Sequence, residues 1–184
     1  MSKTNFYTGK GDRGDTARLG GQGRLAKSDA LIDTIGAMDE ATCVIGVARA
    51  QVQDVLLQET LPEIQRRLYR LMSHLSATPE LRETYVGVTE ADVSWLEALI
   101  AQLEGGLPPL KDFVVPGDSL PGAACHFARA VVRRAERRLV EFAEIEPGIR
   151  ATSLAFVNRL SSLMFVAALR EDQFAGKAPT LARG

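Results

Sequence analysis

The sequence has little of what builds metal sites or disulfide frameworks. Its two cysteines, Cys43 and Cys125, form no Cys-x-x-Cys or Cys-x-x-His spacing, which argues against a cysteine zinc site and a disulfide scaffold. Both lie in apolar stretches with helical character, so we expect two buried free thiols. The two histidines, His74 and His126, have no metal-ligand spacing, and we expect each to be an ordinary core or surface side chain.

Long apolar runs and an excess of one charge are also missing. No run approaches the ~18 residues of a membrane span, and the first residues lack the charged-then-apolar pattern of a signal peptide. We therefore expect a cytoplasmic protein without a membrane partner. The formal net charge is −1, so the overall field does not point to nucleic acid. Anion binding would need local clustering of charge.

Strand signals are nearly absent, apart from a short β-like run at 112–117 (DFVVPG). The dominant pattern is helical: apolar residues recur at spacings of three, four and seven, interrupted by proline and glycine. One domain with an all-α, five-helix bundle is predicted. The expected helices cover residues 29–53, 61–75, 89–103, 121–142 and 154–168.

Individual residues indicate where these helices begin and end. Ser28 is the expected N-cap of the first helix, and Pro62 fits the first turn of the second. Thr89 and Asp92 have the spacing of a capping box for the third helix, which Gly105 should end.

The chain divides into three expected segments. Residues 1–28 are polar and glycine-rich, with neither helical nor strand periodicity. Residues 29–175 hold the five helices and a proline- and glycine-rich loop at 105–120. Residues 176–184 should form a frayed, flexible tail.

The opening stretch 7–16 (YTGKGDRGDT) is the first candidate site. Gly9, Gly11 and Gly14 match the dinucleotide fingerprint formally, but only eight residues precede them and no strand is predicted there. Closely spaced glycines can instead present backbone N–H groups to an oxyanion, and Lys10 adds a cation. A flexible N-terminal segment without function is the alternative.

The second candidate is the arginine block, residues 128–138 (ARAVVRRAERR), with five arginines and one glutamate. Arg129, Arg133 and Arg137 lie at i, i+4 and i+8, so they share one side of a helix. Arginines this dense require carboxylates or a polyanion. A solvated basic face paired with Glu141 and its neighbours is the alternative.

Two single residues complete the candidates. Asp39, beside apolar positions of the first helix, could pair with Arg129 on another helix. Asn158 is mildly unfavourable inside a helix and could be retained for a hydrogen bond, although a solvent-facing position is equally consistent.

Taken in order, these motifs resemble the ATP:cob(I)alamin adenosyltransferases of the propanediol-utilisation type. The likeness runs from Tyr7 to about Phe165, and the arginine block together with FVVPG is its most specific part. The motifs are YTGKGDRGDT, RLAKSD, GAMDEA, ATP at 77–79, FVVPG, ARAVVRRAERR and NRLSSLMF.

The resemblance implies a homotrimer of five-helix bundles with ferritin-like packing and active sites between subunits. The family transfers the 5′-deoxyadenosyl group of ATP to cob(I)alamin, forming adenosylcobalamin and releasing triphosphate. ATP, Mg²⁺ and the corrinoid are the implied ligands. A reductase and an adenosylcobalamin-dependent mutase are the implied protein partners.

The resemblance also implies residue roles. Residues 1–28 would become ordered over ATP, and Phe113 would fill the space beneath the corrin ring. Arg129 would pair with Asp39 across the subunit interface, and these two with Arg133 are the implied catalytic set. The implied ATP contacts are Thr8, Gly9, Lys10, Gly11, Thr16, Lys27, Arg133, Glu136, Arg137 and Asn158.

Three positions depart from the family pattern: Ala41, Thr42 and Ser162. They leave open an alternative, a non-catalytic helical module that binds corrinoid or ATP. A plain helical interaction protein is the third hypothesis.

Overall fold

The structure, a computed structural model, describes residues 7–21, 23–146, 148–149 and 151–183. The parts of the predicted N-terminal segment and tail at 1–6, 22 and 184 lie outside the described residues, as do Pro147 and Arg150 between α4 and α5. The elements are β1 (Asp15–Ala17), β2 (Arg24–Ala26), α1 (Ala30–Arg49), α2 (Val55–Ser76), the short 3₁₀ helix η1 (Pro79–Leu81), α3 (Glu90–Glu104), α4 (Leu120–Ile145) and α5 (Ala151–Phe174).

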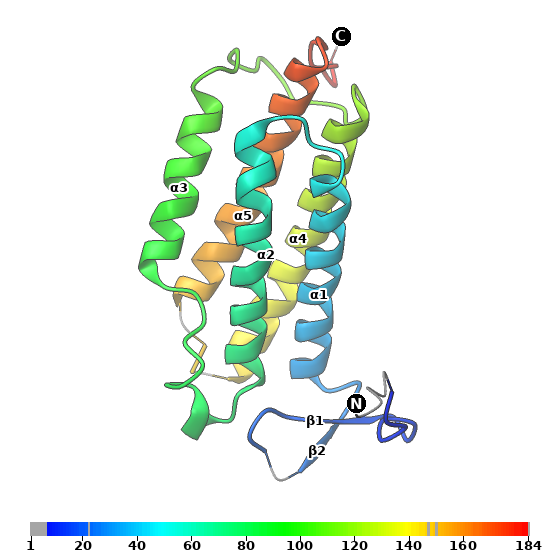
Figure 1. The fold of residues 1–184 in the computed structure, drawn as a ribbon, viewed down its shortest axis with the longest axis vertical. Helices are drawn as coiled ribbons and strands as arrows, with labels where there is room; N and C mark the ends of the chain where they lie inside the picture. Colours follow the sequence, from blue (N-terminus) through cyan, green and yellow to red (C-terminus); the bar gives the residue numbers. More distant parts are fainter. Residues whose placement is uncertain (1–6, 22, 147, 150, 184) are drawn as a thin grey trace, which may run out of the picture.

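The five long helices run side by side as a bundle, which confirms the all-α prediction (Figure 1). Helix α1 packs between α2 and α4, and α5 packs between α4 and α3. The β1–β2 hairpin lies at the end of the bundle where α1 begins, and the loop before α4 lies at the opposite end. Helix α4 therefore runs the length of the molecule between these two ends.

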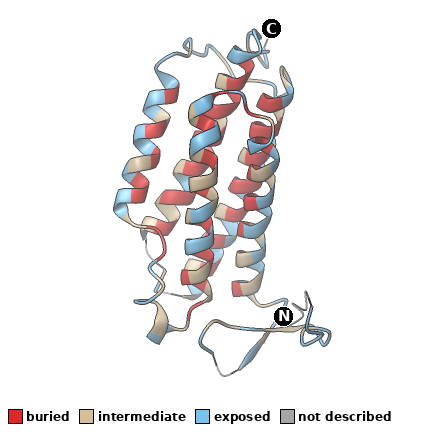
Figure 2. Cartoon of the chain, viewed as in Figure 1, coloured by how far each residue is buried: buried red, intermediate tan, exposed pale blue. Residues whose placement is uncertain are grey.

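A continuous apolar core fills the bundle, with buried residues on the inner side of every long helix (Figure 2). Met38, Ile45, Leu68, Leu139 and Phe156 are each 0 % exposed. Helix α5 is apolar enough and long enough to span a membrane, but 61 % of its most apolar window is buried among the other helices. Such burial is typical of the central helix of a bundle.

Two predicted helix starts are wrong, and the capping bonds explain why. Asp29, not Ser28, caps α1, because its carboxylate accepts a hydrogen bond from the amide of Leu31 at 2.9 Å. Helix α2 begins at Val55 after the cap Asp54, so Pro62 lies inside the helix and not in its first turn. In both helices the N-cap is an aspartate whose carboxylate accepts hydrogen bonds from the free amide groups of the first turn. These bonds, and not the position of a proline, fix where the helix begins.

The N-terminal segment contains an antiparallel hairpin that the sequence analysis did not predict. Strands β1 and β2 pair Thr16 with Leu25. The segment is also fixed to the end of α2, because the Arg18 guanidinium donates to the carbonyl oxygens of Ser76 and Ala77 at 3.3 and 2.9 Å. These carbonyls at a helix end have no intrahelical partner, so the tether depends on the folded bundle.

Part of the predicted C-terminal tail forms backbone hydrogen bonds with the loop before α4. The amide of Ala182 donates to the carbonyl of Phe113, and the amide of Val115 donates to that of Thr180, both at 2.8 Å. Val114 and Leu181 form an isolated antiparallel bridge. The β-like run at 112–117 thus finds its pairing partner more than 60 residues away in the sequence.

The thiol prediction is half correct. Cys125 is buried, and burial raises the pKa of its thiol to about 12, with the charges of Glu171 and Asp172 adding to the effect. Cys43, expected to be buried, is exposed, because it lies on the outer side of α1. His74 is an ordinary core histidine whose Nδ1 lies 2.9 Å from the carbonyl oxygen of Tyr85.

Asp92 stabilises the start of α3, where the predicted capping box with Thr89 is confirmed. Its carboxylate accepts from the Thr89 amide and from Arg67 and Arg70, each at 2.8 Å. Burial by itself raises the pKa of Asp92, but the hydrogen bonds from Thr89, Arg67 and Arg70 outweigh it and hold the pKa below its ordinary value of 3.8.

We expect Asp92→Asn to lower the free energy of unfolding by about 1–3 kcal/mol near neutral pH, because two guanidinium groups lose their charged acceptor. The ionised carboxylate stabilises the fold above its unfolded-state pKa, and this contribution is lost as pH falls through the depressed folded-state pKa. The gap between wild type and variant in urea unfolding should therefore shrink below about pH 4.

The matched control is Glu63→Gln, which removes a more exposed carboxylate from the same arginine, Arg67. We expect it to cost less than about 1 kcal/mol. An equal cost for the two variants, or a gap that does not change between pH 7 and pH 3, would contradict this assignment for Asp92.

Candidate functional site

The arginine block divides between two faces of α4. Arg134 forms an ion pair with Glu40 of α1. Arg138 contacts Asp33 of α1 at 3.0 Å and Glu141 at 2.8 Å. These two arginines agree with the alternative hypothesis, a solvated basic face whose charges are paired with acidic side chains.

The other three arginines lie on the face toward α5, and they differ from Arg134 and Arg138 in their lack of ion pairs. Among the described residues, Arg129, Arg133 and Arg137 form no ion pair with any carboxylate. They are the same three that the sequence places on one side of the helix. Part of α4 therefore carries guanidinium groups that have no ion-pair partner in the described chain.

A pocket of about 400 Å³ lies over this face. Glu136 accepts a hydrogen bond from the side-chain amide of Asn158 at 2.8 Å, which places α5 against α4 at the pocket. The Arg137 guanidinium donates to the carbonyl of Arg133 at 3.1 Å. The pocket brings together four of the predicted ATP contacts, and its lining is Arg133, Glu136, Arg137, Val140, Glu141 and Asn158.

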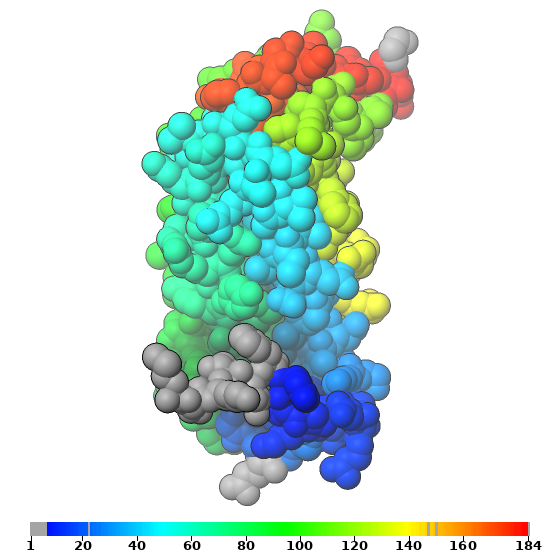
Figure 3. Space-filling view, turned by 45° about the vertical axis from the view of Figure 1, so that its right-hand side comes forward, coloured from blue at the N-terminus to red at the C-terminus, as the bar shows by residue number. Residues whose placement is uncertain are grey.

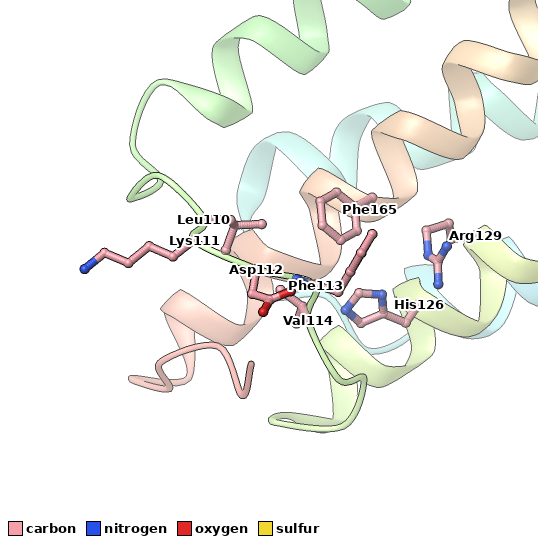
Figure 4. Close-up of a pocket in the computed structure, with 8 residues that line it drawn as sticks. All are labelled: Leu110, Lys111, Asp112, Phe113, Val114, His126, Arg129 and Phe165. Atoms are coloured by element: carbon pink, nitrogen blue, oxygen red, sulfur yellow. Dashed lines mark hydrogen bonds between the residues drawn. The ribbon is translucent and has the colours of Figure 1, made fainter. Parts of the chain in front are cut away.

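A second cavity, of about 420 Å³, lies farther along the same face, and Arg129 is in its wall (Figure 4). Arg129 precedes Arg133 by one helical turn, so the two hollows follow each other along α4. The ring of Phe113 is 80 % exposed. The complete lining is Leu110, Lys111, Asp112, Phe113, Val114, His126, Arg129 and Phe165.

His126 and Phe165 are site residues that the sequence analysis missed. Their rings meet edge to face with centroids 5.8 Å apart. The spacing held a signal: His126 lies three residues before Arg129, and Phe165 lies seven residues after Asn158, so each pair shares a helix face.

Unsatisfied polar atoms in this cavity point to a missing neighbour. His126 is buried, and neither of its ring nitrogens has a hydrogen-bond partner among the described residues. Burial lowers the pKa of His126, and the charge of Arg129 lowers it further, against weaker opposing effects of Asp172 and Asp118. The Arg129 Nε is also buried and unpartnered within the described chain. Buried polar groups are rarely left in this state unless water, a ligand or a partner supplies the bond.

The glycine segment forms a folded loop beside the hairpin. Gly9 and Gly14 have φ of +66° and +79°, which favour glycine. The Arg24 guanidinium donates to the carbonyl of Lys10 at 2.8 Å and contacts the Asp15 carboxylate at 3.0 Å.

This loop and the Arg133 pocket are separate in one chain. Lys27 lines a different hollow together with Arg134 and Arg138. Figure 3 shows the described N-terminal residues gathered at one end of the bundle. The structure therefore does not bring Thr8, Gly9, Lys10, Gly11, Thr16 and Lys27 into the pocket of Arg133.

Asp39 is exposed on α1 and lines a shallow groove of about 450 Å³ with apolar neighbours such as Ile35 and Tyr69. It forms no ion pair with Arg129 within the described chain. Of the three departures from the family pattern, Ala41 and Thr42 are buried, at 1 % and 3 % exposure, and belong to the core. Ser162 is exposed, one turn beyond Asn158 on α5.

The described residues contain no group of three or more histidine, cysteine, aspartate or glutamate side chains arranged to hold a metal ion. In the Arg133 pocket, acidic oxygens come only from Glu136 and Glu141 among the described residues. A divalent ion there would need most of its oxygen ligands from a bound molecule and from water.

Comparison with known proteins identifies the family. The family model described as cobalamin adenosyltransferase matches residues 6–171. A corrinoid adenosyltransferase of Bacillus subtilis is 37 % identical over 168 residues, covering 89 % of this chain and 84 % of the relative. The corrinoid adenosyltransferase PduO of Citrobacter freundii is 34 % identical over 170 residues, covering 91 % of this chain and 50 % of the relative.

A solved structure has nearly the same fold. It is a phenylalanine-to-alanine variant of a PduO-type ATP:corrinoid adenosyltransferase from Lactobacillus reuteri, complexed with cobalamin and ATP. The TM-score is 0.90 at 30 % identity, covering 98 % of this chain and 100 % of that chain. This chain spans about half the length of the PduO relatives of Citrobacter and Salmonella. The match over nearly the whole bundle, together with the arginine face of α4, shows that the chain belongs to the cobalamin adenosyltransferase family.

Proposed function

We propose that this protein transfers the 5′-deoxyadenosyl group of ATP to cob(I)alamin, forming adenosylcobalamin and triphosphate. The observation that carries the proposal is the set Arg129, Arg133 and Arg137, which lacks carboxylate partners in the described chain although Arg134 and Arg138 of the same helix are paired. Such a face suits a polyanion. The neighbouring cavity, lined by Phe113 and Phe165, suits a large and largely apolar ring system.

In this proposal the pocket of Arg133 receives the triphosphate of ATP. Guanidinium groups bind phosphate oxygens through two parallel N–H bonds, so Arg133 and Arg137 fit this role. Asn158 and Glu136, already bonded to each other, provide a neutral and an acidic group for the hydroxyl and amino groups of the nucleoside. Their bond also fixes the spacing of α4 and α5 at the pocket.

The corrinoid would occupy the cavity of Phe113. Phe113 lies on a loop and is 80 % exposed, so its apolar surface is in contact with water. Covering this surface with the apolar face of a ligand would give a favourable free energy of burial. Beneath a corrin ring it would exclude water and the lower axial ligand of cobalt. Cobalt(II) without that ligand is more easily reduced to cobalt(I), the nucleophilic form of the substrate.

The reaction is a single displacement. The electron pair of cobalt(I) attacks C5′ of ATP and becomes the new Co–C bond. The C5′–O bond breaks at the same time, and triphosphate leaves with the electron pair of that broken bond. The cobalt becomes cobalt(III), and no proton transfer is needed in this step. The protein must hold C5′ in line with the cobalt and stabilise the departing charge, so positioning and electrostatics supply the catalysis.

The nucleotide site is proposed to form between subunits of a homotrimer. The glycine loop of one subunit would close over ATP held by the Arg133 pocket of its neighbour. This arrangement would bring Thr8, Gly9, Lys10, Gly11, Thr16 and Lys27 to the phosphates. An ion pair between Asp39 of one subunit and Arg129 of the next would give a partner to a guanidinium whose Nε is buried and unpaired in the described chain.

Mg²⁺ fits this site only when it is bound together with ATP, whose phosphates would supply oxygen ligands. Of the two acids in the pocket, Glu141 is ion-paired with Arg138, so Glu136 is the candidate to hold the ion, and phosphate oxygens and water would supply the remaining ligands. When bound, the ion would neutralise part of the triphosphate charge. We also propose a cytoplasmic location, a reductase that supplies cobalt(I), and a mutase that uses the product.

Arg133→Ala should lower adenosylcobalamin formation by about 10²–10³-fold, because the leaving triphosphate loses a charged donor. The measurement is an anaerobic spectral assay with ATP and chemically reduced cobalamin. Arg66→Ala is the control, since that exposed arginine of α2 is ion-paired with Glu63 and lines neither the Arg133 pocket nor the hollow of Lys27, and we expect near wild-type activity. Comparable activity in the two variants would remove the proposed role of Arg133.

Phe113→Ala should bind cob(II)alamin with its lower ligand still attached, since the ring that occupies the ligand's position is gone. Electron paramagnetic resonance with ATP present reports the four-coordinate cobalt(II) form. Phe174→Ala, which removes a half-exposed phenylalanine outside the cavity, should leave that signal intact. A wild-type signal from Phe113→Ala would contradict the assignment.

Asp39→Arg should weaken the trimer, because it would place two cations together at the proposed interface. The double variant Asp39→Arg, Arg129→Asp should recover part of the assembly by reversing the pair. Sedimentation velocity at several concentrations measures both. A wild type that is monomeric throughout, or a double variant no better than the single one, would exclude this ion pair.

A further inference from the structure

The role proposed for Phe113 requires an exposed ring to hold its position. Packing cannot fix it, because the side chain is 80 % exposed and lies on the loop between α3 and α4. Its backbone, by contrast, is held from outside the loop. Residues 180–183, called here the C-terminal segment, make every long-range backbone hydrogen bond described for residues 112–116.

The contacts form a short ladder along this loop. The Ala182 amide donates to the Phe113 carbonyl at 2.8 Å, and the Val115 amide donates to the Thr180 carbonyl at 2.8 Å. Val114 pairs with Leu181 between these two bonds. The residue that carries the ring is therefore fixed as one position of a two-stranded ladder.

Thr180 fixes the other end of the loop. Its hydroxyl donates to one oxygen of Asp118 at 2.6 Å, and its amide donates to the other at 2.8 Å. These two bonds hold the pKa of Asp118 below its ordinary value, as expected for an ionised acceptor. Asp118 directly precedes Ser119, the N-cap of α4, whose hydroxyl donates to Asp172 of α5 at 2.6 Å. The ladder is thus connected to both helices that form the cavity.

We propose that the C-terminal segment positions Phe113 for the corrinoid, with Thr180 and the Ala182 amide as the positioning groups. This inference rests on the function proposed for Phe113. Neither group lines the cavity, so they act through the loop and not by contact with the corrinoid. Loss of the Thr180 hydroxyl bond to Asp118, or of the Ala182 amide bond to Phe113, should let Phe113 leave its position. The bundle and the pocket of Arg133 should not change.

The test compares Thr180→Val, which removes the hydroxyl donor, with Ala182→Pro, which removes the amide donor to Phe113. Each should lower the four-coordinate fraction of bound cob(II)alamin by about threefold to tenfold, the effect of one hydrogen bond on an equilibrium. The KM for the corrinoid should rise, whereas ATP affinity and the melting temperature should stay near wild type. Thr180→Ser, which keeps the donor, should restore the signal.

Thr152→Val is the matched control. Thr152 donates to the Glu90 carboxylate at the same distance of 2.6 Å, at an exposed position, and neither residue lines the cavity of Phe113. It should leave the cobalt signal unchanged. Wild-type signals in both Thr180→Val and Ala182→Pro, beside a lost signal in Phe113→Ala, would overturn this inference alone. An unchanged signal in Phe113→Ala would overturn the proposed role of Phe113 and the inference with it. An equal loss of ATP affinity would indicate general disruption and would also overturn it.

Discussion

Three arginines without an ion-pair partner in the described chain, on one face of α4, are the constraint on which the candidate site depends. Five arginines within eleven residues repel one another, and the fold neutralises only part of that charge. Acids of α1 and Glu141 pair with Arg134 and Arg138, while Arg129, Arg133 and Arg137 have no ion-pair partner among the described residues. A helix can carry such a face because its other sides are buried in a core that stabilises it independently.

The architecture separates stability from binding. Buried leucine, valine and alanine side chains of five helices supply the core, so the core does not depend on the two hollows that lie along α4 and α5. One hollow on this face is lined by charged side chains of both signs, and the other has aromatic walls. Two hollows with different linings therefore follow each other along one helix, and Arg129 lies in the wall of the aromatic one.

The N-terminal and C-terminal segments are both attached to the helical part of the molecule by hydrogen bonds. The N-terminal loop is shaped by glycines in the left-handed region and by Arg24, and Arg18 fixes it to the carbonyl end of α2. The C-terminal segment pairs with the loop of Phe113. Neither segment has a core of its own. The N-terminal segment combines its own hairpin with the bonds of Arg18 to the end of α2, and the C-terminal segment bonds to the loop before α4.

The sequence by itself determined the five helices, the capping box at Thr89, and the placement of three arginines on one side of α4, because these depend on local spacing along a helix. Only the tertiary structure decided which arginines are paired, since Glu40 and Asp33 come from another helix. It also decided that His126 and Phe165 share a cavity with Phe113, and that the C-terminal residues pair with its loop. Such contacts join residues far apart in the chain, and no local periodicity encodes them.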